Sequence, residues 1–329
     1  MNTELNTLLA SLQMAEAQNC RNIMIFPLIC PGNGALEYRT LGEAIQERSL
    51  TLAEVSQGGS VPELKVINRG NTPVLLIDGE ELVGAKQNRV LNTSILLKEN
   101  SETVIPVSCT EQGRWAYASA GFADAGVVMA HRSRACKSHS VSESLAKGAR
   151  FTSNQGEVWS EIQALHAKAH FHSPTHAMHD LFLARQADLE MCLKAFALVP
   201  KQNGLLVLIN GAVAGLDYVS RPKAYARLHA KLLKSYVIEG LVEPGQGALD
   251  AGPARERAKA FLAEAQQCKA SQFPSIGYGV DVRLKKPGLL GTALVHEARV
   301  IHTAFFRLSA QDEAGRLAPL RSRRWFGLE

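Results

Sequence analysis

Short apolar runs separated by turn residues fill the first third of the chain and predict a strand-rich segment. The runs lie at Ile23–Ile29, Leu50–Val55, Leu64–Asn68, Val74–Ile77, Glu81–Ala85, Val90–Leu97 and Thr103–Cys109. Asp78-Gly79 separates two of these runs and predicts a tight hairpin. Thr40 followed by Glu43 is a capping-box pattern for a helix over Leu41–Gln46. A short opening helix is predicted by the spacing of Leu5, Leu8, Leu9 and Leu12.

Apolar residues at helical spacing predict helices through the middle of the chain. They share a face in four stretches, at Val158 to Leu165, at Met178 to Phe196 after Ser173-Pro174, at Tyr225 to Tyr236, and at Ala258 to Ala265. Between them, Leu205–Ile209 predicts a strand that turns at Asn210-Gly211. Strands are predicted again near the C-terminal end, over Ile276–Leu284, Thr292–Glu297 and Val300–Arg307.

These elements predict an α+β fold, with a strand-rich N-terminal part, a helical middle, and C-terminal strands that complete mixed or antiparallel sheets. The predicted organisation is an N-terminal helix over 1–21, one domain over 22–308 and a basic tail over 309–329. An apolar run with an Asx-Gly turn occurs at Leu76–Gly79 and again at Leu208–Gly211. The domain is therefore either two similar lobes, about 22–150 and 151–308, or it contains two unrelated hairpins that obey one turn rule.

The composition is that of an ordinary globular protein, with 46% hydrophobic and 20% charged residues in 329. A net charge of +5 is compatible with a small anionic ligand but is too weak to indicate duplex nucleic acid. Six cysteines without a C-x-x-C pair predict free thiols rather than a disulfide framework. No apolar run reaches the roughly 20 residues of a membrane helix, and no signal peptide is visible. We therefore expect a cytoplasmic protein without a membrane partner; a homo-oligomer is left open.

The richest candidate chemistry lies between Glu80 and Trp115. Glu80 and Glu81 are neighbours on one predicted strand, so their carboxylates should point to opposite faces and only one can join a given site. One of them is a candidate general base, hydroxyl acceptor or metal ligand. The alternative is that both are solvated residues at the mouth of a hairpin.

Lys86-Gln87-Asn88-Arg89 continues this polar run. Buried amides need hydrogen-bond partners, and an arginine fork beside a lysine suits phosphate or carboxylate, so the four residues are candidate ligand-binding groups. The alternative is an edge strand that uses charge against aggregation. Cys109, with Glu111 and Arg114 close behind it, is either an activated nucleophile or a small buried residue. Glu111 and Arg114 can also pair with each other and order a turn.

Five histidines gather within one stretch of the helical middle, at His166, His170, His172, His176 and His179. The first two are one helical turn apart, a usable metal spacing, but the glutamate of an H-E-x-x-H motif is absent and no cysteine is interleaved. We therefore expect surface histidines at a helix junction and assign no metal site. No phosphate-binding P-loop and no G-x-S-x-G nucleophile elbow occur in the chain.

Two motifs resemble the signature of the ADP-ribosylglycohydrolase and rhodanese-phosphatase associated protein domain, the ARPP domain. The first runs from Asp78 to Arg89, and the second joins Pro106-Val107-Ser108-Cys109 to Glu111-Gln112-Gly113-Arg114-Trp115. Weaker similarity at Gln155–Trp159, Leu232–Tyr236 and Val300–His302 extends the resemblance over about 22–308. Its implied site residues are Glu80, Glu81, Lys86, Gln87, Asn88, Arg89, Cys109, Glu111 and Arg114.

The resemblance implies proximity to the chemistry of ADP-ribose and related products of NAD, and such an inference from association is not a mechanism. The first hypothesis is a protein that binds, and processes, ADP-ribose or a similar phosphorylated nucleoside. In it Lys86, Arg89 and Arg114 hold phosphate, Gln87 and Asn88 recognise hydroxyls or the base, and a carboxylate serves as acid–base group or binds Mg²⁺. The second hypothesis is a non-catalytic nucleotide sensor or an assembly module. The sequence does not decide whether the protein is an enzyme.

Overall fold

The computed structural model describes residues 2–31, 36–243, 245, 247 and 249–308. The basic tail expected over 309–329 lies outside these described residues. The helices are α1 (Asn2–Ser11), α2 (Leu41–Gln46), α3 (His131–Ala146), α4 (Gln155–Lys168), α5 (Met178–Ala184), α6 (Gln186–Ala195), α7 (Pro222–Val242) and α8 (Ala251–Ala265). None of the described helices is long and apolar enough to cross a bilayer.

The largest described sheet joins the two ends of the chain. Its order is β1-β3-β13-β14-β18-β17-β16-β15, with β2 also paired to β3, and every pairing is antiparallel. The strands are β1 (Gln13–Met14), β2 (Gln18–Cys20), β3 (Ile23–Ile29), β13 (Gln202–Ile209), β14 (Ala212–Val219), β15 (Lys269–Pro274), β16 (Val280–Lys286), β17 (Leu289–His296) and β18 (Arg299–Arg307). The C-terminal strands thus complete a sheet begun near the N-terminus, and the α+β prediction is confirmed.

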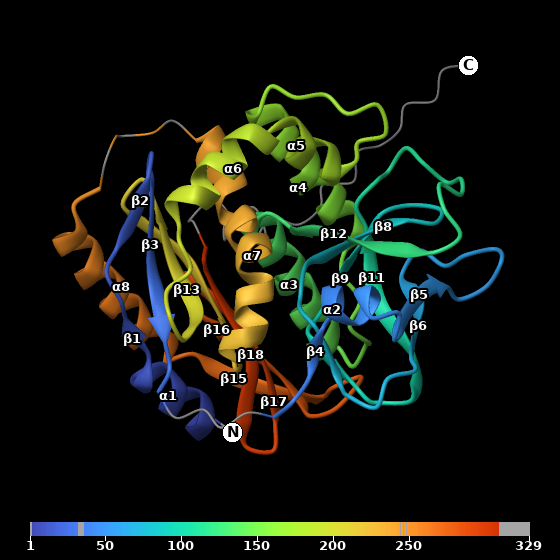
Figure 1. Ribbon diagram of the computed structural model, residues 1–329, viewed down its shortest axis with the longest axis horizontal. Coiled ribbons are helices and arrows are strands. Elements are labelled where there is room, and N and C mark those ends of the chain that lie inside the picture. The colour runs from blue at the N-terminus through green and yellow to red at the C-terminus, as the bar shows by residue number, and fades with distance from the viewer. Residues whose placement is uncertain (1, 32–35, 244, 246, 248, 309–329) are drawn as a thin grey trace.

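Two smaller sheets form the other side of the molecule. One has the order β12-β8-β9-β11-β6-β5, from β12 (Phe122–Val128), β8 (Glu80–Gly84), β9 (Arg89–Leu91), β11 (Ser101–Cys109), β6 (Glu63–Asn68) and β5 (Leu50–Glu54). The other has the order β10-β7-β4, from β10 (Ile95–Leu97), β7 (Val74–Leu76) and β4 (Arg39–Thr40), and the pairing of β4 with β7 is parallel. Figure 1 shows α7 running between these sheets and the large one.

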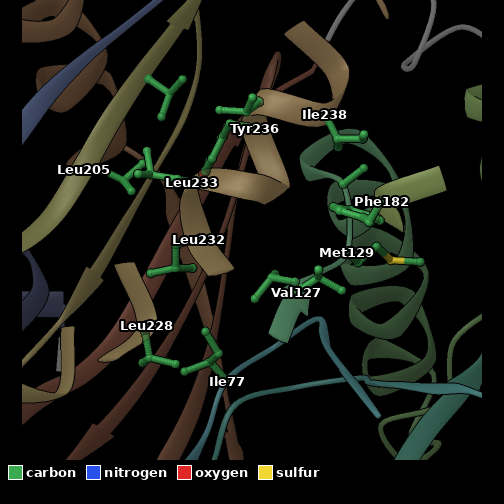
Figure 2. Close-up of a cluster of buried hydrophobic side chains, with 14 of the residues drawn as sticks. Ile77, Val127, Met129, Phe182, Leu205, Leu228, Leu232, Leu233, Tyr236 and Ile238 are labelled. Atoms are coloured by element: carbon green, nitrogen blue, oxygen red, sulfur yellow. The ribbon is translucent and has the colours of Figure 1, made fainter. Parts of the chain in front are cut away.

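The large sheet is buried on both faces, which explains the unbroken apolar run of β13. Leu205 and Val207 face a core shared with α4–α7, whereas Leu206 and Leu208 face a second core built with α1 and α8. The first core is drawn in Figure 2, where Leu228, Leu232 and Tyr236 of α7 lie among residues from several elements. Proline at the first position of α7 supplies a preset helical φ. α7 therefore forms the link between the two halves.

Several sequence predictions need correction. β7 and β8 do not form a hairpin around Asp78-Gly79, because β7 pairs with β10 and β4 whereas β8 pairs with β9 and β12. The Asp78 carboxylate is held instead by Lys137 and Arg134. The Asn210-Gly211 turn does join paired strands, so the two similar turns differ in structure. The run Val90–Leu97 is divided into β9 and β10, the helix expected over 178–196 is divided into α5 and α6, and β16 begins only at Val280.

Helix α3 was not predicted, because its buried face is polar. The residues Arg134, Lys137, Ser138 and Val141 recur at helical spacing and are buried, but only one of them is apolar. A search for apolar periodicity therefore passes over this segment. The helices and strands that were predicted, including the capping box of α2, depend on local patterns that the structure retains.

Candidate functional site

The polar run from Glu80 to Trp115 lies on β8, β9 and β11 and in the loops that join them. Leu82 and Cys109 are both register partners of Arg89, whereas Glu81 is the partner of Val90. Directly opposed residues lie on one face of a sheet and neighbours along a strand lie on opposite faces. Arg89 and Glu81 therefore project to different sides of the sheet.

Arg89 is fully buried and only partly satisfied. Its Nη1 donates to Gln87 Oε1 at 2.9 Å and to the carbonyl of Asn88 at 3.4 Å. Its Nε and Nη2 have no hydrogen-bond acceptor among the described residues. These two groups form one edge of the planar guanidinium, the fork that binds carboxylate or phosphate with two parallel bonds. Burial lowers the pKa of Arg89, as expected for a cation short of acceptors.

Aromatic and charged side chains surround this fork. The Arg89 guanidinium carbon lies 5.7 Å from the centre of the Trp115 ring, and Lys86 Nζ lies 5.2 Å from the ring centres of Trp115 and Tyr117. Both carboxylate oxygens of Glu54 are buried and have no hydrogen-bond donor among the described residues. We call Arg89, Glu54, Lys86 and Trp115 the Arg89 cluster. It combines an unsatisfied cation, an unsatisfied carboxylate and an exposed aromatic ring, and Tyr117 lies beside it.

A glycine lies against the cluster. Gly59 has a φ of +77°, and a Cβ on it would lie 3.2 Å from Lys86 Cδ and 3.4 Å from both Glu54 Oε2 and Trp115 Cζ2. The loop after β5 therefore meets three members of the Arg89 cluster at one point. A side chain at this position would need a strained backbone conformation and would contact Lys86 closely, whereas its contacts with Glu54 and Trp115 would be ordinary.

Glu111, Arg114 and Asn88 bind one another. Arg114 Nη2 lies 2.6 Å from Glu111 Oε2 and 3.1 Å from Asn88 Oδ1, and its Nη1 donates to the carbonyl of Ala85 at 2.7 Å. The backbone N–H of Asn88 donates to Glu111 Oε2 at 3.2 Å. The two sequence motifs thus meet in space. Arg114 therefore joins the loop after β8 to the loop after β11, and most of its guanidinium donors bind protein acceptors.

Cys109 lies beside this group without exposure to solvent. Its Sγ lies 3.4 Å from the backbone N–H of Glu111. Burial raises the pKa of the Cys109 thiol, and the opposing attraction of Arg89 is smaller. The environment therefore favours the thiol over the thiolate that nucleophilic attack requires.

Glu80 lies apart from the Arg89 cluster, in a buried ion triad. Lys231 Nζ on α7 lies 2.7 Å from Glu80 Oε1 and 2.6 Å from Asp124 Oδ2. The backbone N–H of Ile77 donates to Glu80 Oε2 at 2.8 Å. Burial disfavours the Lys231 cation, but the attraction of the two carboxylates outweighs it and raises the pKa of Lys231. The triad fixes α7 against β8 and β12.

Glu81 forms a separate pair on the other face. Its Oε1 accepts a hydrogen bond from Thr110 Oγ1 at 2.9 Å, and its Oε2 lies 3.1 Å from Nδ1 of His179 on α5. Burial raises the pKa of Glu81, and the hydrogen bond to Glu81 raises the pKa of His179. His179 belongs to the histidine stretch seen in the sequence. In the part of the chain that the structure describes, no group of three or more metal-ligating side chains is close enough to hold a metal ion.

A second charged network, which the sequence did not reveal, occupies the centre of the molecule. The Arg134 guanidinium binds Asp217 with two bonds, of 2.8 and 3.0 Å, and lies 3.3 Å from Asp78 Oδ2. Lys137 Nζ binds the other oxygen of Asp78. All four side chains are fully buried and bind one another, so the network joins α3, β14 and the turn before β8.

Sequence reasoning missed Glu54, Lys231, Asp124 and the α3 cations. Each is a single charged residue in an ordinary pattern, and its partner is distant in sequence: Lys231 and Glu80 are 151 positions apart. No local signal distinguishes such residues from solvated ones.

A family model matches residues 11–306 of this chain, and it describes the ARG and Rhodanese-Phosphatase-superfamily-associated Protein domain. No curated protein and no solved structure matches the chain. The match includes every residue of the two sequence motifs and of the Arg89 cluster.

Proposed function

This chain belongs to the ARG and Rhodanese-Phosphatase-superfamily-associated Protein domain family, and from that premise we propose that it binds a phosphorylated nucleoside of the ADP-ribose type. The proposed site is the Arg89 cluster. The observation that carries the proposal is the free Nε–Nη2 edge of a fully buried arginine. A buried donor without an acceptor costs about 1–3 kcal/mol, and more when it is charged, so a ligand that satisfies this edge gains that energy on binding.

Each part of such a ligand has a matching group in the cluster. A phosphate accepts two hydrogen bonds from Arg89, and Lys86 adds a second positive charge close by. A sugar hydroxyl donates to the unsatisfied carboxylate of Glu54. The base stacks on Trp115 or Tyr117, whose rings are half exposed. Mg²⁺ would accompany the phosphate when the nucleotide carries it, and the proposal takes the cytoplasm as the compartment.

The proposal is tested by titration calorimetry and thermal shift with ADP-ribose, NAD and simple nucleotides, each with and without Mg²⁺. A ligand at 100 times its dissociation constant stabilises the protein by about 2.7 kcal/mol. Arg89→Lys retains the charge and removes the fork, so affinity should fall roughly 10- to 100-fold, in line with about 1.5–3 kcal/mol for charged hydrogen bonds. Arg150→Gln, which removes an exposed arginine with a 91% accessible side chain, is the control and should bind normally.

Glu54→Gln separates two roles of the carboxylate. A hydroxyl acceptor predicts weaker binding in the variant, whereas a carboxylate that only neutralises Arg89 predicts tighter binding. The proposal fails if no compound shifts the melting temperature, or if Arg89→Lys binds as well as the unaltered protein.

Turnover distinguishes a catalyst from the sensor or assembly module that is the alternative. Release of products from each bound ligand is followed by chromatography for the unaltered protein and for Glu81→Gln and Cys109→Ser. A catalyst that uses either residue loses turnover in that variant and keeps its affinity. A sensor shows no turnover with any bound ligand.

A further inference from the structure

A cavity in the described part of the chain lies on the large sheet, whereas the strands of the Arg89 cluster belong to another sheet. It has a volume of about 820 Å³ and is lined by residues of α3 and of β15 and β16, the two strands at one edge of the large sheet. α3 packs on β17 and β18, and its side chains His139 and Glu143 form one wall. A volume of this size suits a small organic molecule.

Two lysines that face this cavity oppose each other directly. Lys269 on β15 is the register partner of Lys285 on β16, and both line the cavity. Directly opposed side chains in an antiparallel pair have Cβ atoms about 4.5–5.5 Å apart, and like charges at this spacing destabilise the sheet. Among the described residues, neither ammonium group forms an ion pair with a carboxylate. Lys285 Nζ instead lies 3.1 Å from His139 Nε2, which brings no negative charge.

The rest of the lining is a mixture of cationic and apolar groups. Lys286 adds a third ammonium group, and Glu143 is the one carboxylate among the lining residues. Phe273, Leu290 and Leu308 supply apolar surface next to the lysines. The cavity therefore offers positive charge at one part of its lining and a hydrophobic surface at another.

We propose that this cavity binds a small amphiphilic anion, an aliphatic or aromatic body that carries one carboxylate or phosphate head group. The head group lies between Lys269 and Lys285 and relieves their repulsion. The body covers Phe273 and Leu290, where burial of apolar surface contributes to binding. This site does not depend on the Arg89 cluster, because the two share no residue and lie on different sheets.

Calorimetric titration of the full chain tests the ligand class. Decanoate and decyl phosphate are the probes. Decanol is the control that has the apolar body without a charge, and acetate and inorganic phosphate are the controls that have the head group without the apolar body. Both amphiphiles should bind at least tenfold more tightly than any of the three fragments, and their relative affinity shows which head group is preferred. Binding of the amphiphiles no tighter than that of the fragments would overturn the proposal.

Lys285→Glu tests the lysine pair. The variant replaces a like-charge pair with an opposite-charge pair, so its melting temperature without ligand should rise while its affinity for decanoate falls at least tenfold. Lys223→Glu, the same charge change at an exposed position of α7, should retain the affinity. A Lys285→Glu variant that binds decanoate normally refutes the site, whatever its melting temperature.

Discussion

Replacement of Arg134 by methionine removes the cation that two buried carboxylates share. Arg134 Nη1 and Nη2 bind the two oxygens of Asp217, and its Nε lies 3.3 Å from Asp78 Oδ2. None of these side chains reaches solvent. Methionine fills a similar length without charge, so the variant isolates the electrostatic loss from the loss of packing.

The expected loss of stability follows from the partners that each carboxylate retains in the variant. Asp78 keeps Lys137, whereas among the described residues Asp217 keeps the Tyr236 hydroxyl at 2.8 Å and His302 Nε2 at 3.5 Å. Removing one partner of a buried pair costs about 3–5 kcal/mol, because an uncompensated charge remains. Burial acts to raise the pKa of Asp217, but the attraction of Arg134 outweighs it and lowers that pKa. In the variant this attraction is lost, so the loss of stability caused by the substitution should be smaller at acid pH, where Asp217 takes up a proton.

Thermal melting followed by circular dichroism measures the effect. At about 2 °C per kcal/mol for a chain of this size, Arg134→Met should melt roughly 6–10 °C below the unaltered protein at pH 7. Arg150→Met, in the loop after α3, is the matched control. Its ion pair with Glu63, at 3.8 Å, has a 91% exposed arginine side chain, so the loss should stay below about 1 kcal/mol. Equal melting temperatures for the two variants would show that Arg134 does not stabilise the buried carboxylates.

Three further predictions concern stability. Burial raises the pKa of Glu239 to about 8 from 4.5, so between these pH values the folded state holds a proton that the unfolded state lacks. The stability of the folded state therefore falls as the pH rises from 4.5 to 8. Glu239→Gln should remove this pH dependence from melting temperatures measured between about pH 5 and 8.5. Thr40→Ala removes the capping box of α2 and should cost about 1 kcal/mol in denaturant titrations. Gly79→Ala forces a Cβ at φ +82° to within 3.0 Å of Arg134 Cδ. It should therefore lower the melting temperature more than Gly148→Ala, which has a similar φ of +76° and no atom within 4 Å.

Local patterns predicted most of the helices and strands. The spacing of apolar residues identified α7 and β13, and the capping box located α2, because these patterns depend on neighbours within a few positions. The alternation of side chains along β8 placed Glu80 and Glu81 on different sides, and the structure gives them separate partners, Lys231 and His179. The prediction of a hairpin at Asp78-Gly79 was wrong. Turn propensities depend on adjacent residues and do not include the buried cations on α3 that bind the Asp78 carboxylate.

The fold class, the family, and the segment with unusual polar chemistry could all be inferred from the sequence. The three-dimensional arrangement divides that chemistry into Arg89 with Glu54 and Trp115 in one cluster, Glu80 in an ion triad, and Glu81 with His179. The difference arises from the range over which each interaction acts along the chain. Helix, strand and turn preferences are set by adjacent residues, whereas the state of a buried charge depends on the groups that folding brings to it across the whole chain.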